Sequence, residues 1–283
     1  MIVARPDIVT RIGIGLDHAE SLSMDEHGTI FAGGEKGQVY RIAPGGTPEI
    51  IAETGGDLLG SALDAAGNLY VCDCSQRAVW CVDPDGALRP LSRGTRQRPL
   101  TFPNHPAFDA DGNLYVSDSG DYWDPVGTGS VHVIRPDGRA EVLHDGPFRF
   151  TNGISVDPSG EWLYVAQSAA WNVVRIPLGR RNGPIEPAFQ LAPYTIPDGI
   201  VFTEDGVLLV ACYKPDLVLA CHPGGRIEVL VEDPTGELLL RPTNVVLSDE
   251  QLYVANLGGR WISRFDLPGW SDELRHRPAV RSA

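Results

Sequence analysis

The sequence is poor in basic residues and lacks a long apolar run. It has 23 Lys and Arg against 37 Asp and Glu, and its formal net charge is −14. Because nucleic acids and anionic membranes are bound through clustered Lys and Arg, we expect neither as a partner. No apolar run reaches the roughly 18 residues of a membrane-spanning helix. The N-terminal segment "MIVARPDIVTRIGIG" lacks the zones of a secretory signal, so we expect a soluble, cytoplasmic protein.

The sequence also lacks the short motifs of several enzyme classes. It contains no G-x-S-x-G nucleophile elbow, no H-E-x-x-H zinc motif and no Walker phosphate loop. Its five cysteines form no C-x-x-C pair, although Cys72 and Cys81, and likewise Cys212 and Cys221, lie nine residues apart around a short turn. A disulfide between cross-strand neighbours is one interpretation of this spacing. Buried free thiols in a reducing compartment are the other, which we favour.

What the sequence does contain is an internal repeat. Six segments follow one plan of strand, turn, strand, loop and strand, for example "SALDAAGNLYVCDCSQRAVWCVDPDG" and "GISVDPSGEWLYVAQSAAWNVVRIPL". Short apolar or alternating runs between turn residues indicate strands, and no stretch has helical periodicity. A period of about 40–48 residues with three or four strands per unit is typical of a β-propeller. The sequence therefore predicts an all-β, six-bladed propeller with four-stranded antiparallel blades around a central channel, as a single domain over residues 1–283.

The last repeat is too short to supply its own outer strand. The N-terminal segment "DIVTRIGI" has the composition of a strand and belongs to none of the six repeats. We therefore expect it to complete the last blade and close the ring.

Polar residues recur at one position of the repeat, directly before the innermost strand. Aligning the repeats on their turns places five of them in register, namely Glu20, Asn104, Asn152, Asp198 and Asn244. From Asn104 onward the spacings are 48, 46 and 46 residues, and Glu20 lies 84 residues, or two blades, before Asn104. The second blade has the apolar Leu59 near this place. Because innermost strands face the channel, these side chains should converge at one mouth.

Two carboxylates and several carboxamides in one ring suit a hard divalent cation. Ca²⁺ takes oxygen ligands of this kind, whereas zinc is disfavoured because no His or Cys joins the ring. Uncompensated polar groups facing one another are costly to bury. The alternative interpretation is that these side chains cap backbone groups or bind channel water.

The motifs around these positions are similar to those of a known family. They are "HAES" with Glu20, "FPNHPAFDADGNLYVSDSG" with Asn104, "FTNGISVD" with Asn152 and "IPDGIVF" with Asp198. With them the sequence resembles the senescence-marker-protein/gluconolactonase/regucalcin family of six-bladed propellers over nearly its whole length. The resemblance implies hydrolysis of a small-molecule lactone or related ester. It also implies one divalent metal ion held by Glu20, Asn152 and Asp198, with Asn104 beside the substrate. Ca²⁺ is the first choice, and Mg²⁺, Mn²⁺ and Zn²⁺ also fit the family.

Two departures from the family pattern bear on the substrate. His105 stands where the family usually has an acid, and Phe102 stands where sugar-lactone members often have Arg. Four aromatic residues in loops expected at the mouth are further substrate-binding candidates, namely Tyr122, Trp123, Trp171 and Tyr213. They favour a substrate with an apolar or aromatic acyl group. The long insertion "SGDYWDPVGTGS" is a candidate lid, because long loops on a rigid scaffold commonly cover a site.

The implied mechanism needs a general base. The resemblance assigns this role to Asp198, while polarisation of the substrate carbonyl falls to the metal ion. A carboxylate bound to a cation is a poor base, so His105, which also remains a substrate-binding candidate, is the alternative because an imidazole titrates near neutrality.

Two other classes of function stay open at this point. The same metal-binding propeller could serve a lyase or an isomerase in a small-molecule pathway. It could also be a non-catalytic interaction scaffold, because propellers host many functions. The sequence leaves the oligomeric state open as well.

Overall fold

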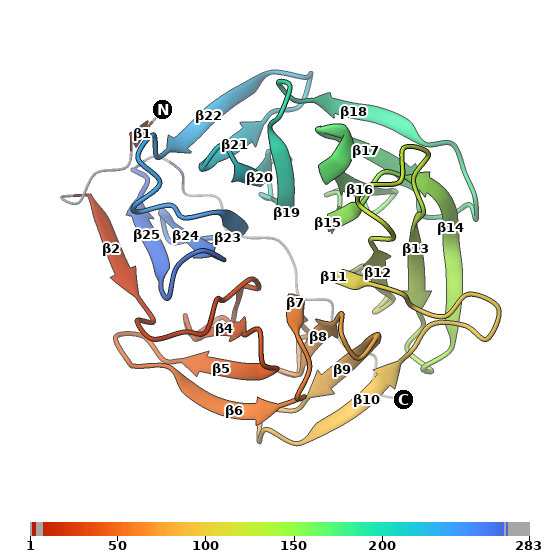
Figure 1. Ribbon diagram of the computed structural model, residues 1–283, viewed down its shortest axis with the longest axis horizontal. Helices are drawn as coiled ribbons and strands as arrows, with labels where there is room; N and C mark the ends of the chain where they lie inside the picture. Colours follow the sequence, from red (N-terminus) through yellow and green to blue (C-terminus); the bar gives the residue numbers. More distant parts are fainter. Residues whose placement is uncertain (1, 4–7, 269, 271–283) are drawn as a thin grey trace.

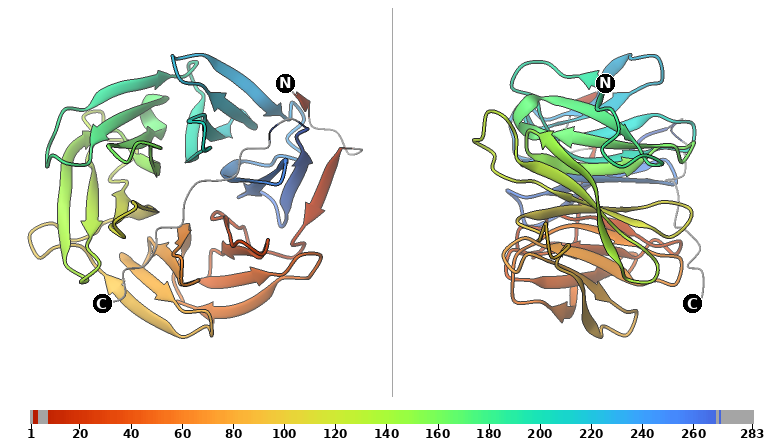
Figure 2. Two further views of the ribbon diagram at one scale, coloured as in Figure 1. Left: turned by 180° about the vertical axis from the view of Figure 1, so that it is seen from behind. Right: turned by 90° about the vertical axis from the view of Figure 1, so that its right-hand side faces the viewer.

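The protein is a ring of six β-sheets around a central channel (Figure 1). The computed structural model describes residues 2–3, 8–268 and 270. Over these residues, five sheets have four strands and one has five. Neighbouring strands within each four-stranded unit are antiparallel, which confirms the predicted six-bladed propeller. Seen from the side, the ring is a short, thick cylinder (Figure 2).

Each blade begins with its strand next to the channel and runs outward. The first blade contains β3 (Ser23–Met24), β4 (Ile30–Gly33), β5 (Gln38–Ile42) and β6 (Glu49–Glu53). The second contains β7 (Leu58–Leu63), β8 (Leu69–Asp73), β9 (Ala78–Val82) and β10 (Leu88–Ser92). The third contains β11 (Pro103–Phe108), β12 (Leu114–Asp118), β13 (Gly129–Ile134) and β14 (Ala140–Phe148).

The other three blades follow the same order. The fourth contains β15 (Thr151–Val156), β16 (Trp162–Gln167), β17 (Asn172–Pro177) and β18 (Glu186–Gln190). The fifth contains β19 (Ile196–Phe202), β20 (Leu208–Lys214), β21 (Leu217–Cys221) and β22 (Ile227–Glu232), with β1 (Ile2–Val3) parallel to β22. The sixth contains β23 (Pro242–Ser248), β24 (Gln251–Asn256), β25 (Ile262–Asp266) and β2 (Val9–Ile12). The 3₁₀ turn η1 (Ser168–Ala170) follows β16, and no helix of the described residues is long and apolar enough to span a membrane.

The N-terminal strand closes the ring, as predicted. β2 pairs antiparallel with β25, from Val9 opposite Phe265 to Ile12 opposite Ile262. Val9 also packs against the apolar cluster that contains the fully buried Phe265. The first and last parts of the propeller therefore share one sheet, which removes a free edge at the point of closure.

Apolar side chains fill the space between adjacent blades. Between the third and fourth blades, Val131 and Val133 of β13 share one buried cluster with Ile154 of β15 and Val165 of β16. A similar cluster joins the fifth and sixth blades. Because each sheet is covered on both faces by its neighbours, the innermost strands form a rigid wall for the channel.

The hairpin turns explain the recurring Asp and Gly of the repeat. In the second blade, one carboxylate oxygen of Asp64 accepts hydrogen bonds from the backbone N–H groups of Ala66 and Asn68, both at 2.9 Å. Gly67 in the same turn has φ +83°, a conformation that favours glycine. These turns set strand length and so keep the start of each innermost strand at one mouth.

All five cysteines are free and buried. Cys72 lies opposite Val79, and Cys81 lies opposite Tyr70, so the nine-residue spacing does not place the two thiols directly across from one another. The interpretation as buried free thiols is confirmed.

Candidate active site at one mouth of the channel

Two cavities are lined by the described residues of the innermost strands, and we call them the upper and the lower cavity. The upper cavity, of about 350 Å³, is lined by residues at the beginnings of innermost strands and by the loops around them. The lower cavity, of about 420 Å³, is lined by residues further along the same strands. The four residues that the motifs single out as a metal and substrate site, Glu20, Asn104, Asn152 and Asp198, all line the upper cavity.

A β-bulge at the start of the innermost strands sets the direction of three of these side chains. In β11, Pro103 lies opposite Asp118 and Pro106 lies opposite Val116, so three steps on the inner strand match two on its partner. β15 and β19 have the same bulge after Thr151 and Pro197. Asn104, Asn152 and Asp198 are the residues that directly follow the bulge onset. A bulge re-aims a side chain, and its repetition in three blades brings three polar groups to one place.

The glycine of the "TNG" and "PDG" motifs lets neighbouring blades approach closely. A Cβ atom on Gly153 would collide with the backbone carbonyl of Asp198, and one on Gly199 would collide with that of Thr243. The bare backbone at these two positions therefore keeps Asn152 and Asp198 on adjacent blades near each other, and the Asn152 side chain donates a hydrogen bond to Asp198.

Asn244 does not belong to this group. In β23, Val245 lies opposite Val254, which is the pairing that Pro106, Ile154 and Ile200 make in the other blades. The residue equivalent to Asp198 is therefore Thr243, whose hydroxyl donates to the backbone carbonyl of Glu20 at 3.0 Å. The predicted alignment was one residue out, because spacing alone cannot show where a bulge begins. Asn244 faces the lower cavity instead.

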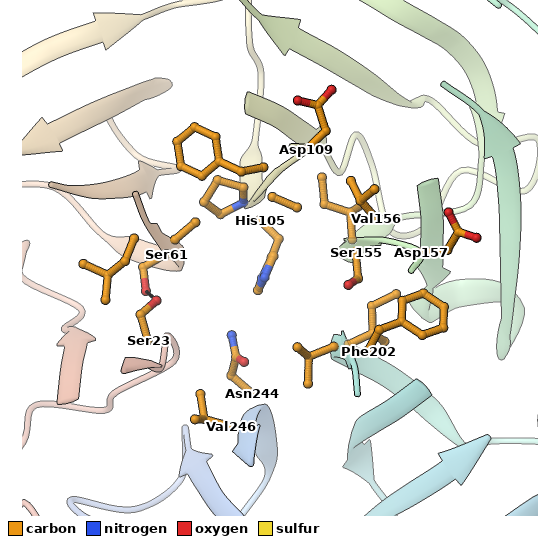
Figure 3. Close-up of a pocket in the computed structure, with 18 of the residues that line it drawn as sticks. Ser23, Ser61, His105, Asp109, Ser155, Val156, Asp157, Phe202, Asn244 and Val246 are labelled. Atoms are coloured by element: carbon orange, nitrogen blue, oxygen red, sulfur yellow. Dashed lines mark hydrogen bonds between the residues drawn. The ribbon is translucent and has the colours of Figure 1, made fainter. Parts of the chain in front are cut away.

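His105 also points into the lower cavity rather than toward the carboxylates. Figure 3 shows the rings and side chains of this cavity, where His105 and Asn244 point toward one another across the channel. Burial lowers the pKa of His105 to about 4. At neutral pH this imidazole is therefore uncharged and weakly basic, and it is not placed to act as the base or to bind substrate in the upper cavity.

The upper cavity is strongly acidic. Besides Glu20 and Asp198, its lining includes Glu35 and Asp57, and none of its described lining residues is Lys, Arg or His. Burial, then the charge of Asp198, then those of Asp57 and Glu35, raise the pKa of Glu20 well above its usual range. Burial raises the pKa of Asp198 to about 8, against hydrogen bonds from the Asn152 side chain and the Gly199 backbone. Loss of hydration disfavours the charged form of both carboxyl groups, and for Glu20 the neighbouring negative charges add to this effect.

The donor set fits a hard divalent cation. Among the described residues, no group of three or more His, Cys, Asp and Glu side chains is arranged to hold a metal ion, so a site here needs carboxamide oxygens as well. Asn104 is 3 % exposed, Asn152 5 % and Asp198 7 %. Buried oxygens of this kind require a partner, and two carboxylates with carboxamides match the ligands of Ca²⁺ or Mg²⁺.

Aromatic side chains form another part of the upper cavity. The ring of Phe150 lies 6.0 Å from that of Phe102 and 5.1 Å from that of Tyr122, centroid to centroid. Tyr213, Ile196 and other apolar residues add to the lining. Of the four aromatic candidates, the structure brings Tyr122 and Tyr213 to the cavity. Trp123 packs on Tyr122 and is 84 % exposed, and Trp171 packs on Tyr194 outside the lining.

Sequence reasoning missed Glu35 and Asp57. Glu35 lies in the hairpin between β4 and β5, and Asp57 lies directly before β7, two residues ahead of Leu59. Burial raises the pKa of Asp57, a hydrogen bond from the Cys74 thiol lowers it, and the charge of Glu35 raises it further. Neither residue stands at the repeated position, so the spacing that revealed the other acids could not find them.

Comparison with known proteins gives one family and a set of similar folds. The model of the SMP-30/gluconolactonase/LRE-like region matches residues 18–258. No curated protein matches the sequence.

Three solved structures illustrate the fold similarity. A gluconolactonase from Xanthomonas campestris has 19 % identity and a TM-score of 0.78, with 92 % of this chain and 89 % of that chain covered. Regucalcin, a calcium-binding protein from Agrobacterium tumefaciens, has 16 % identity and a TM-score of 0.77, with both chains fully covered (100 %). Virginiamycin B lyase from Staphylococcus aureus has 14 % identity and a TM-score of 0.66, with 90 % and 84 % covered. At these identities the similarity is one of fold.

Proposed function

Because the chain belongs to the SMP-30/gluconolactonase/LRE-like family, we propose that it is a metal-dependent hydrolase of a lactone or related ester. The observation that supports this proposal is the meeting of Glu20, Asn104, Asn152 and Asp198, from four different blades, in one cavity. A scaffold protein has no need to bury carboxylates and carboxamides together without a cationic partner, because that arrangement costs stability.

Glu20, Asn152 and Asp198 would hold the divalent ion, Ca²⁺ by preference. When bound, such an ion polarises the substrate carbonyl and stabilises the negative charge that develops on its oxygen. The surrounding residues then have defined tasks. Asn104 donates a hydrogen bond to a substrate oxygen, and the aromatic residues Phe102, Tyr122 and Phe150 hold the apolar part of the substrate and exclude water from it.

Asp198 is the proposed general base. It accepts the proton of the attacking water at a carboxylate oxygen, and the hydrogen bond from Asn152 keeps that carboxylate oriented. The environment of His105 in the lower cavity leaves Asp198 as the better placed of the two candidates.

A lyase or isomerase using the same residues is the second candidate. Its specific support is the fold similarity to virginiamycin B lyase, with a TM-score of 0.66. The Asp198 carboxylate could there remove a proton from a carbon next to a carbonyl group. The two reactions differ in whether water is consumed.

A screen of simple lactones and aryl esters, with and without EDTA, tests the proposal. Hydrolysis that EDTA abolishes and added Ca²⁺ or Mg²⁺ restores is the expected result. Metal binding with no hydrolysis of any substrate would favour the lyase or isomerase. Absence of metal binding would leave only an interaction scaffold.

A further inference from the structure

We propose that the upper cavity selects substrates by charge: Glu35 and Asp57 favour a cationic or uncharged group beside them and reject an anionic one. The claim about turnover rests on the proposed lactonase or esterase function. The claim about binding does not.

Glu35 and Asp57 come from the first and second blades and line the same cavity as the proposed metal ligands. One Asp57 oxygen accepts the Cys74 thiol at 3.6 Å, which is its only side-chain hydrogen bond among the described residues. Glu35 is half exposed, and its carboxylate lies 3.3 Å from Nδ1 of His18. A single imidazole carries at most one positive charge, so it cannot neutralise both carboxylates.

With a divalent ion bound, Glu35 and Asp57 would be the two carboxylates of the cavity without a compensating positive charge. A divalent ion carries two positive charges, which Glu20 and Asp198 offset. Glu35 and Asp57 then contribute two further negative charges, and the described lining contains no Lys, Arg or His to oppose them. A cleft with walls of low dielectric constant concentrates such a field, so a substrate anion is repelled and a cation is attracted.

Three cations next to lining residues of the cavity are engaged with other groups. Lys36 lies 3.0 Å from Asp17, and Lys214 lies 2.7 Å from Asp216. The guanidinium of Arg241 stacks over Tyr213, 5.6 Å from the ring centroid, and Arg241 itself does not line the cavity.

The aromatic residues complete the description of the substrate class. Phe102 and Phe150 directly precede the innermost strands of the third and fourth blades, whereas Glu35 and Asp57 come from the first and second blades. A ligand that spans the cavity therefore combines an apolar or aromatic part with an ammonium or an uncharged polar group. The substrate class is a lactone or ester of that kind, and phosphorylated or carboxylated lactones are excluded.

Binding of three matched phenyl compounds tests this independently of turnover. Calorimetric titration of the full chain with Ca²⁺ present would use 2-phenylethylamine, 2-phenylethanol and phenylacetate as the cationic, neutral and anionic probes. We expect the amine to bind on the order of tenfold more tightly than the carboxylate, and high salt to narrow this gap. Because phenylacetate can also contact the metal ion directly, the decisive comparison is between protein variants.

The double variant Glu35→Gln, Asp57→Asn should bring the affinities for the amine and the carboxylate close together. The matched control, Glu53→Gln, removes one exposed carboxylate from β6, outside both cavities. It should keep the wild-type ratio of the affinities for the amine and the carboxylate. The two single substitutions serve if thermal unfolding shows that the double variant is not folded. Tighter wild-type binding of phenylacetate, or an unchanged ratio in the folded variants, would overturn the proposal.

Turnover of a matched lactone series separates this inference from the proposed function. The series is γ-butyrolactone and its ring-substituted amino and carboxyl derivatives. We expect kcat/KM to fall from the amino to the carboxyl compound, and the double variant to flatten that trend. If none of the three is hydrolysed and the screen of lactones and aryl esters is also negative, the lactonase proposal fails while the binding result stands. If all three are hydrolysed with equal kcat/KM, the charge selection fails while the lactonase proposal stands.

Discussion

At the scale of single residues, burial shifts the pKa values of two ionisable groups of the channel in opposite directions. It raises the pKa of Asp198 to about 8 and lowers that of His105 to about 4. In both cases water is removed from the charged form, which is the anion for Asp and the cation for His. The carboxyl group thereby becomes the more basic of the two, which reverses the order of the free amino acids.

Replacing Asp198 by Asn is expected to abolish turnover while the fold persists. The substitution keeps the shape of the side chain but removes the proposed base and one metal ligand, so kcat should fall by about a thousandfold or more. Steady-state kinetics and circular dichroism would measure the two effects. Asp266→Asn, on the exposed face of β25, is the control. Wild-type kcat in a folded Asp198→Asn protein would rule out this assignment.

Replacing His105 by Asn is expected to make the protein more resistant to acid. The folded-state pKa of about 4 lies below the unfolded value, so between about pH 6.5 and 4 the unfolded chain binds a proton that the native state does not. The free energy of unfolding of the wild type should therefore decrease as the pH falls from about 6.5 to about 4. This group contributes at most about 1.4 kcal/mol per pH unit to the decrease. Urea unfolding at several pH values would measure it.

The His105→Asn variant should lose this part of the pH dependence of the free energy of unfolding. His27→Asn provides a control, because the His27 side chain is 80 % exposed and keeps ordinary hydration. An identical pH slope in wild type and His105→Asn would show that the buried imidazole titrates normally.

At the scale of elements, β2 has a greater effect than its four residues suggest. It is the outer strand of the sixth blade, and through it the first and last parts of the propeller become one sheet. Without β2, the edge of β25 and part of the apolar cluster around Phe265 would be exposed.

Deleting residues 1–12 should therefore lower the melting temperature and the cooperativity of unfolding. Deleting residues 1–7 leaves β2 in place and is the matched control, which should retain most of the stability. Differential scanning calorimetry of both truncated proteins would test this. Equal melting temperatures for the two would mean that β2 does not close the ring in solution.

The loop between β12 and β13 is a preformed part of the site. The N–H of Asp121 donates to the Thr128 hydroxyl at 2.8 Å, and the N–H of Trp123 donates to the Asp121 carboxylate at 2.9 Å. These local bonds give the loop a fixed shape, with Tyr122 on the cavity. In this structure the loop contributes Tyr122 to the lining of the upper cavity, and its role as a lid stays a prediction.

At the scale of the whole molecule, a bound cation should link stability to pH. Asp198 has a folded-state pKa of about 8, above its unfolded value. In the metal-free protein its contribution to stability is therefore fully present below about pH 4 and is lost as pH rises towards 8. A divalent ion binds the deprotonated carboxylates, so it binds better at the higher pH and offsets this loss.

Millimolar Ca²⁺ should accordingly raise the melting temperature more at about pH 8 than at about pH 5. A ligand present at a hundred times its Kd stabilises the native state by about 2.7 kcal/mol. Thermal unfolding with Ca²⁺ and with EDTA at both pH values would measure the difference. An effect of equal size at the two pH values, or none at all, would contradict a cation site built on Asp198 and Glu20.

The sequence by itself determined the propeller and four of the residues at its mouth. Strand spacing and turn residues repeat six times, and a repeat can bury both faces of its small sheet only by stacking in a ring. Glu20, Asn104, Asn152 and Asp198 occupy one position of that repeat, so symmetry alone brings them together. Family motifs added their expected roles.

Only the tertiary structure decided the rest. Whether Asn244 or Thr243 joins the group depends on where a bulge begins, and a shift of one residue turns a side chain from one cavity to the other. Glu35 and Asp57 lie in loops outside the repeat, so no periodicity reports them. The direction of His105 and the separation of Trp123 and Trp171 from the cavity likewise depend on three-dimensional packing. The physical reason is that a repeat specifies the positions of strands, while loop paths and strand irregularities specify where individual side chains point.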